Sequence, residues 1–180
     1  IELVHRLDRD TSGCLLIAKT RECLLSLQQQ MLSDEIDKRY LTLLKGEIRQ
    51  DELYVEQPLQ KNTVSSGERM VKVDSAGKKA KTLFITKQAF GLAQLTEVKL
   101  FTGRTHQIRV HSAWSGHPVA GDDKYGDREF NKTMKSYGLK RLFLHAWRLG
   151  IRHPISNEPL LLEAPLPDNL VSVVSHMEHA

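Results

Sequence analysis

The feature that most constrains the fold is a succession of short β-prone segments with few helices between them. These segments are apolar or alternating and rich in β-branched and aromatic residues. Short turns separate most of them, which favours a mixed, mostly antiparallel β-sheet of the α+β class over a doubly wound sheet. Strands are predicted at residues 14–20, 39–48, 70–74, 81–89, 92–100 and 159–165, and residues 141–153 form a strand pair or one bent strand.

Helices are expected at three places in this chain. Residues 20–33 begin with Thr20 and residues 105–114 begin with Thr105, and a threonine is a common N-cap. A final helix begins at residue 167 or 168, where a proline starts it, and extends to about residue 176. The few helices are therefore expected to flank the sheet.

The composition is that of a globular protein with a basic surplus. The 180 residues are 40% hydrophobic and 27% charged, enough for one sizeable core and one domain. No apolar segment approaches the roughly 20 residues that span a bilayer, so no membrane partner is expected. Two cysteines in apolar contexts fit a reduced, cytoplasmic setting. The net charge of +4 is compatible with a polyanionic partner.

The segment HRLDRDTSG places Asp8 between Arg6 and Arg9, directly before an apolar run. Loops held by rigid elements are where reactive side chains usually lie. The same residues also fit a simple turn, because Thr11 and Ser12 can hydrogen-bond the loop backbone and the following glycine can adopt positive φ. A functional interpretation needs a second segment that brings a cation to Asp8.

The segment GRTHQIRVH supplies such a cation. Helical spacing places His106, Arg109 and Ala113 on one face, so Arg109 is expected to be a partly buried cation beside a carboxylate. We predict that the charged atoms of Asp8 and Arg109 lie within about 4 Å of each other. Arg104 is the alternative partner, although it precedes the helix.

Three motifs of this chain, HRLDRDTSG, KRYL and GRTHQIRVH, resemble those of pseudouridine synthases of the RluA type. The resemblance continues through LLKGE, SGERMVKV, GHPVAGDDKYGD, RLFLHAWRL and EAPLP, and so covers nearly the whole chain. It implies a mixed, largely antiparallel sheet with a catalytic cleft across its middle. It also implies an enzyme that isomerises uridines of large-subunit (23S) ribosomal RNA to pseudouridine.

The resemblance implies a role for each matching residue. Asp8 corresponds to the catalytic aspartate, Tyr40 to the tyrosine that stacks on the target base, and Arg109 to the basic residue that pairs with the aspartate. Arg6 corresponds to an arginine that helps to displace the target base, and Leu144 to an apolar wall residue. Further basic side chains expected to contact RNA are Arg9, Arg104 and His106.

Members of this family carry opening strands with a KPSG-like segment before the first motif, and one branch carries an S4-type RNA-binding domain. Because the chain begins at Ile1, inside a motif, residues 1–180 are interpreted as a fragment of the catalytic domain that lacks these parts. A monomer is expected. No cofactor and no metal are expected, because the reaction needs no redox step or activated phosphate.

The chemistry also follows from physical requirements. Pseudouridine formation breaks an N-glycosidic bond, rotates the uracil and joins its C5 to C1′ of the sugar. This needs a tight slot without competing water and one nucleophile or base. Arg109 would keep the Asp8 carboxylate charged, Tyr40 can stack on uracil, and its phenol can relay the proton lost from C5.

Two other classes of function stay open at this point. A non-catalytic RNA-binding module in ribosome assembly needs the basic clusters but not Asp8. A metal-dependent nuclease needs several carboxylates around Asp8, and only Asp10 is near it in sequence. The combination of Asp8 with Tyr40 and Arg109 favours the isomerase.

Overall fold

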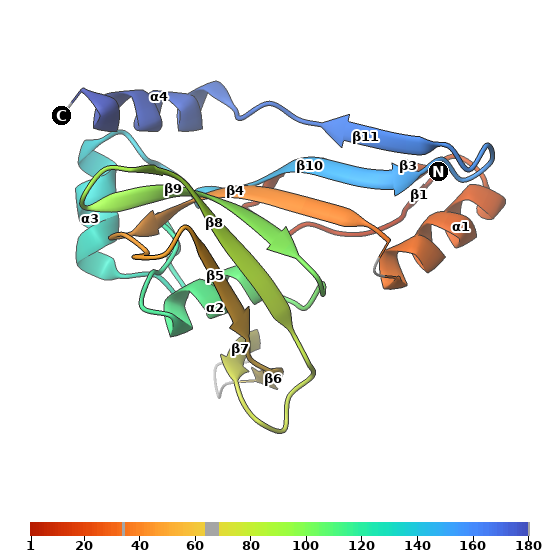
Figure 1. Ribbon diagram of the computed structural model, residues 1–180, viewed down its shortest axis with the longest axis horizontal. Coiled ribbons are helices and arrows are strands. Elements are labelled where there is room, and N and C mark those ends of the chain that lie inside the picture. Colours follow the sequence, from red (N-terminus) through yellow and green to blue (C-terminus); the bar gives the residue numbers. More distant parts are fainter. Residues whose placement is uncertain (34, 64–68, 180) are drawn as a thin grey trace.

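The computed structural model describes residues 1–33, 35–63 and 69–179, so residues 66–68 of the SGERMVKV motif lie outside the described part. Within it, seven strands form the main sheet (Figure 1). Six follow the order β11-β10-β4-β9-β8-β5 with antiparallel neighbours, and the seventh, β2, pairs in parallel with β10. The strands are β2 (Ser12–Gly13), β4 (Asp37–Lys45), β5 (Glu52–Glu56), β8 (Lys81–Ala89), β9 (Ala93–Leu100), β10 (Leu144–Arg152) and β11 (Pro159–Glu163).

Two small ribbons and four helices complete the described structure. Strand β1 (Glu2–Leu3) pairs with β3 (Ile17–Ala18), and β6 (Leu59–Thr63) pairs with β7 (Arg69–Val73). Figure 1 shows α1 beside β1 and β3 at one end of the sheet, and α3 and α4 at the other. None of the described helices is long and apolar enough to cross a membrane. The helices are α1 (Arg21–Leu32), α2 (Gln107–Trp114), α3 (Arg128–Ser136) and α4 (Asp168–Glu178).

The predicted α+β class with a mostly antiparallel sheet is confirmed. Strand β8 has the predicted bounds, β9 begins one residue late, and residues 144–152 form one strand rather than a pair. Thr20 caps α1 as predicted, because its side chain accepts a hydrogen bond from the backbone N–H of Cys23 at 3.2 Å. Strands β5 and β6 and helix α3 were not predicted.

The prediction of a buried strand at residues 14–20 is wrong. Only Ile17 and Ala18 are in a strand there, and the side chains of Leu15 and Ile17 are exposed. The segment passes from one sheet to another: the backbone N–H of Cys14 bonds to β10, whereas Leu16 accepts a bond from Val4. Because its hydrogen bonds are divided between two partners, no continuous ladder forms along the apolar run.

The predicted cap of the second helix is also wrong. The helix begins at Gln107, and the N-cap is His106, which is left-handed with φ 55° and makes no side-chain cap bond. The side chain of Gln107 stabilises this turn, because its oxygen accepts from the Thr102 hydroxyl at 2.7 Å and from the Arg104 N–H at 3.0 Å. Thr105 therefore does not cap the helix, although Trp114 ends it as predicted.

The two faces of β4 contact different cores. Tyr40 and Leu44 pack with Ile108 of α2 on one face, while Leu43 packs with α3 and α4 on the other. The predicted alternation along this strand is therefore confirmed for these residues. It points Tyr40 toward the side of the sheet that α2 covers.

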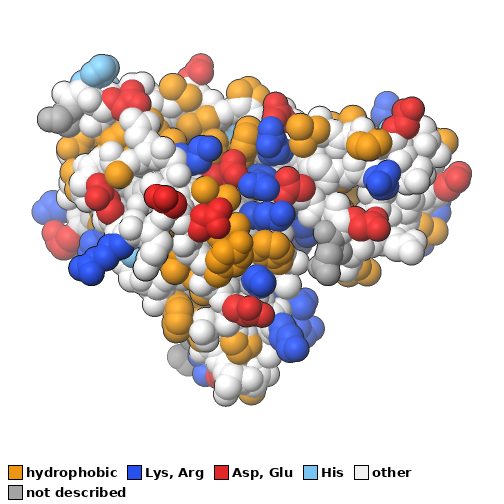
Figure 2. Space-filling model, viewed as in Figure 1, with side chains coloured by type: hydrophobic (Ala, Val, Ile, Leu, Met, Phe, Trp, Pro, Cys, Tyr) orange, Lys and Arg blue, Asp and Glu red, His pale blue; other side chains and the backbone are white. Residues whose placement is uncertain are grey.

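The charges on the face of the sheet shown in Figure 2 are balanced. Basic and acidic side chains gather over the middle strands, above a hydrophobic patch. Arg39 lies 2.9 Å from Asp37 and 2.7 Å from Glu97, and Arg148 lies 2.9 Å from Glu163. These pairs leave little surplus charge over the middle strands.

Gly13 allows the loop that carries Asp8 to pack against β10. Its φ is 116°, and a Cβ at this position would lie 2.1 Å from the carbonyl oxygen of Ala146. A side chain would push the loop away from the strand, so the position of Asp8 depends on this glycine.

We expect Gly13→Ala to lower the free energy of unfolding by about 3 kcal/mol, because the new Cβ meets backbone and the φ is strained. Gly91→Ala is the matched control, since Gly91 also has positive φ but open space around it, and it should cost about 1 kcal/mol. Urea unfolding of both variants measures the difference. Equal losses would contradict the close packing of Gly13.

Candidate active site

The segments of the three motifs meet in one pocket of about 100 Å³. It lies between the loop before β2, strand β4, the N-terminal end of α2 and strand β10. The structure brings together every predicted site residue except Arg9, which lines a neighbouring groove. The predicted residues that line the pocket are Arg6, Asp8, Tyr40, Arg104, His106, Arg109 and Leu144.

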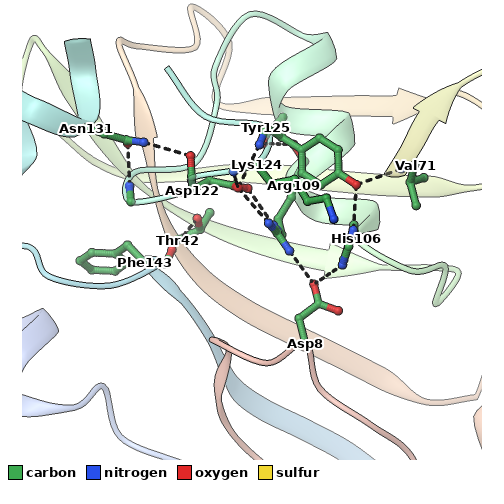
Figure 3. Close-up of polar contacts among 12 residues, drawn as sticks. Asp8, Thr42, Val71, His106, Arg109, Asp122, Lys124, Tyr125, Asn131 and Phe143 are labelled. Atoms are coloured by element: carbon green, nitrogen blue, oxygen red, sulfur yellow. Dashed lines mark hydrogen bonds and ion pairs between the residues drawn. The ribbon is translucent and has the colours of Figure 1, made fainter. Parts of the chain in front are cut away.

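Asp8 and Arg109 form the ion pair that the sequence predicted. Nη1 of Arg109 lies 3.5 Å from Oδ2 of Asp8, and Nε2 of His106 lies 4.0 Å from the same oxygen (Figure 3). Arg104 instead donates from Nε to the carbonyl oxygen of Lys79. The carboxylate of Asp8 is thus close to a cation and remains partly open to the pocket, with 22% of its side chain exposed.

A second carboxylate, Asp122, holds Arg109 more tightly than Asp8 does. Nε and Nη2 of Arg109 donate to the two oxygens of Asp122 at 2.7 and 2.9 Å, and the Asp122 side chain is fully buried. Oδ1 also accepts from the backbone N–H groups of Lys124 and Tyr125. Burial alone would raise the pKa of Asp122, but these hydrogen bonds outweigh it and lower that pKa.

Burial opposes the charge of Arg109, but the hydrogen bonds to Asp122 raise the pKa of Arg109 above its ordinary value. The guanidinium is therefore permanently charged, and its remaining nitrogen, Nη1, faces Asp8. Sequence reasoning did not identify Asp122. The only signal was its place in GHPVAGDDKYGD, where nothing distinguishes it from Asp123.

His106 is held in one orientation by Tyr125. The Tyr125 hydroxyl accepts from the backbone N–H of Val71 at 2.9 Å and bonds to Nδ1 of His106 at 2.8 Å. The Tyr125 hydroxyl is placed to donate its proton to Nδ1, and in that tautomer the ring proton is on Nε2, facing Asp8. Burial lowers the pKa of His106, with Arg109 and Lys124 acting in the same direction and Asp8 against them. The ring is thus neutral at pH 7.

Tyr40 and Leu144 form apolar walls of the pocket, and Leu144 is only 3% exposed. Burial, reinforced by the charge of Asp8, raises the pKa of Tyr40 to about 12. The phenol therefore keeps its proton at neutral pH. Thr11 also lines the pocket, and its buried hydroxyl has no hydrogen-bond partner among the described residues.

Ser12 and Arg141 anchor the loop of Asp8 to the sheet. The Ser12 hydroxyl bonds to Nδ1 of His145 in β10 at 2.8 Å, and Arg141 donates to that hydroxyl and to the carbonyl oxygen of Asp10. The expectation that the Thr11 and Ser12 side chains bond to the loop backbone is therefore wrong. The turn is closed instead by the backbone N–H of Thr11, which donates to the carbonyl oxygen of Asp8.

The arrangement presents the carboxyl group of Asp8, beside the cation Arg109, and a neutral phenol in a small pocket with apolar walls. Such a site suits attack or proton abstraction on a flat, uncharged ring. Among the described residues, no group of three or more His, Cys, Asp and Glu side chains could hold a metal ion.

Comparison with known proteins defines the class to which the chain belongs. The family model for RNA pseudouridylate synthase matches residues 1–114, and this chain is a member of that family. The resemblance seen in the motifs is thereby confirmed.

Within the family, the chain is similar to particular curated members. The chain is 47% identical over 174 residues to ribosomal large subunit pseudouridine synthase C of Pasteurella multocida (strain Pm70), covering 97% of this chain and 53% of the relative. It is 46% identical over 182 residues to the protein of that name in Escherichia coli (strain K12), covering 100% of this chain and 57% of the relative. The chain thus spans about half the length of the curated relatives it matches.

Two solved structures resemble the fold. Human RNA pseudouridylate synthase domain containing 1 superposes with a TM-score of 0.78 at 27% identity, covering 92% of this chain and 69% of the other. Human RNA pseudouridylate synthase domain containing 4 superposes with a TM-score of 0.80, covering 98% of this chain and 76% of the other. At 24% identity, the second likeness concerns the fold alone.

We expect Asp122→Asn to lower the free energy of unfolding at pH 7 by about 3 kcal/mol, because it leaves the buried charge of Arg109 poorly compensated. The folded-state pKa of Asp122 is lowered, so its contribution is present above the ordinary pKa of about 3.9 and is lost as the pH falls through the folded value. The difference from wild type should therefore shrink below about pH 4.

Urea unfolding at pH 7 and pH 3 measures this difference. The matched control is Asp123→Asn, because Asp123 is the exposed neighbour in the same loop. A loss for Asp122→Asn that stayed constant between the two pH values would show that the carboxylate charge is not its cause.

Proposed function

We propose that this chain isomerises uridine to pseudouridine in large-subunit ribosomal RNA. The observation that carries the proposal is the Asp8 carboxylate, held 3.5 Å from Arg109 in a pocket that Tyr40 and Leu144 also line. Membership in the RNA pseudouridylate synthase family and the names of the relatives support the substrate class. The protein is proposed to act as a cytoplasmic monomer without metal or cofactor.

Asp8 is the residue proposed to start the reaction, as nucleophile or as base. Its contact with Arg109 is made through Nη1 to Oδ2 alone, which leaves the other carboxylate oxygen open toward the pocket. After the N-glycosidic bond breaks, the uracil has to stay in place while it rotates to present C5 to C1′. Stacking on Tyr40 and contact with Leu144 would retain it and exclude water.

The exposed arginines at the pocket mouth are proposed to contact RNA. Arg6 and Arg104 both line the pocket and are exposed. Extraction of a nucleotide from its stack costs a few kcal/mol, and contacts of arginine and lysine with phosphates can offset this cost. Binding should therefore weaken as salt increases.

The other classes of function fit the site less well. A non-catalytic RNA-binding module in ribosome assembly does not need a carboxylate fixed beside Arg109. A metal-dependent nuclease needs a cluster of acidic ligands around Asp8, and no such cluster lies within the described ranges.

We expect Asp8→Asn to abolish pseudouridine formation while RNA binding persists, because the amide can neither attack carbon nor accept a proton. The assay incubates the protein with unmodified large-subunit ribosomal RNA and maps new pseudouridines. Asp51→Asn, on an exposed turn away from the pocket, should retain wild-type activity. Substantial turnover by Asp8→Asn would refute its role and support the binding-module alternative.

Tyr40 is expected to relay a proton in addition to stacking. Tyr40→Phe keeps the ring and removes the hydroxyl, so a relay predicts a fall of about 10²-fold in the single-turnover rate with little change in RNA affinity. Stacking alone predicts near-normal activity for Tyr40→Phe and a loss only for Tyr40→Leu. Near-wild-type rates for both variants would exclude both roles.

A further inference from the structure

Two larger grooves adjoin the pocket of Asp8 and share lining residues with it. The first, named here the α3 groove, has a volume of about 530 Å³ and shares His106 and Arg109 with the pocket. The second, named here the β7 groove, has a volume of about 350 Å³ and shares Gly103 and Arg104 with it. Asn131 lines the α3 groove and Val71 lines the β7 groove, and Figure 3 shows these two residues on opposite sides of the view, with Asp8 between them.

The α3 groove has positive walls. Arg9 of the Asp8 loop forms one wall, with a side chain that is 95% exposed, and Lys135 and Lys140 form the opposite wall. Both lysines are exposed, and neither has an ion-pair partner within the described ranges. The lining also contains the basic residues Arg109, Lys124 and Arg141 and the acidic residues Asp10, Asp122 and Asp123, so basic side chains outnumber acidic ones by six to three. The groove therefore carries a surplus of positive charge.

The β7 groove combines positive and apolar side chains. Lys61 of β6, Lys78 of the turn after β7 and Arg104 lie around it, together with the buried residues Leu59 and Val71. Its described lining contains no acidic residue. Backbone bonds between Leu59 and Lys78 fix the turn against β6, so Lys78 projects from a defined position.

We propose that the two grooves hold the phosphate backbone of one RNA strand on both sides of the uridine that enters the pocket, an inference that rests on the proposed function. Because each groove shares lining residues with the pocket, a strand that lies along both grooves passes the pocket and can bring one nucleotide to Asp8. Such a strand is unpaired at the target, since its uridine leaves the stack. Lysines contact phosphates as point charges, so these grooves supply affinity and register but do not read sequence.

Two double variants test the proposal by the salt dependence of binding. Lys135→Ala/Lys140→Ala changes the α3 groove, and Lys61→Ala/Lys78→Ala changes the β7 groove. The control, Lys19→Ala/Lys87→Ala, removes the same charge from exposed lysines outside both grooves. The probe is a single-stranded fragment of unmodified large-subunit ribosomal RNA.

Each groove variant should bind the fragment about tenfold more weakly at 0.1 M salt, and the slope of log K against log salt should decrease in magnitude by about 1.4, as expected for two phosphate contacts to a single strand. The control should bind within about twofold of wild type. Shortening the fragment on one side of the target should remove the defect of one groove variant and retain the defect of the other.

The outcomes separate this proposal from the proposed function. If the wild type forms pseudouridine but the groove variants bind with unchanged affinity and slope, the RNA path is refuted and the enzyme assignment stands. If the groove variants lose affinity as expected but the wild type forms no pseudouridine, the path stands and the proposed function fails. An equal loss in the control variant would refute the path, because general surface charge would then explain binding.

Discussion

The site depends on one guanidinium that two carboxylates share unequally. Arg109 gives Asp122 two short hydrogen bonds, at 2.7 and 2.9 Å, and gives Asp8 one contact at 3.5 Å. The inequality matters, because a carboxylate fully engaged by a bidentate arginine would have little freedom to react with a substrate. Asp122 binds most of the guanidinium, so the carboxylate of Asp8 has a single long contact with Arg109 and remains available to a substrate.

The sheet makes this arrangement rigid by joining segments that are distant in the sequence. Strand β10 supplies Leu144 to the pocket and holds the Asp8 loop through His145 and Ala146. Helix α2 packs on the adjacent face of the sheet through Ile108, one residue before Arg109. Groups that must act together are therefore carried by elements with a shared core, which limits their relative movement.

Much of this fold could be predicted where local pattern and tertiary context agree. Residues 81–89 are rich in β-prone side chains and are bounded by turns, so their strand was predicted correctly. The apolar run at residues 14–20 was not, because its composition does not reveal that its hydrogen bonds go to two different partners. Thr105 has good cap propensity, but the side chain of Gln107 closes that turn instead. Asp122 was missed because only its burial distinguishes it from the neighbouring aspartates of its loop. The sequence does not show which aspartate of such a loop is buried.

The full burial of Asp122 links the order of folding to the acquisition of activity. Before residues 119–125 pack beneath α2, the charge of Arg109 has no buried counterion, and a helix docked on the sheet with an uncompensated cation is unstable. Docking of the helix and of this loop is therefore cooperative. A partly folded chain lacks both the loop and an oriented partner for Asp8. The site should consequently appear only with the complete native structure, and a chain that has folded its sheet but not this loop would lack it.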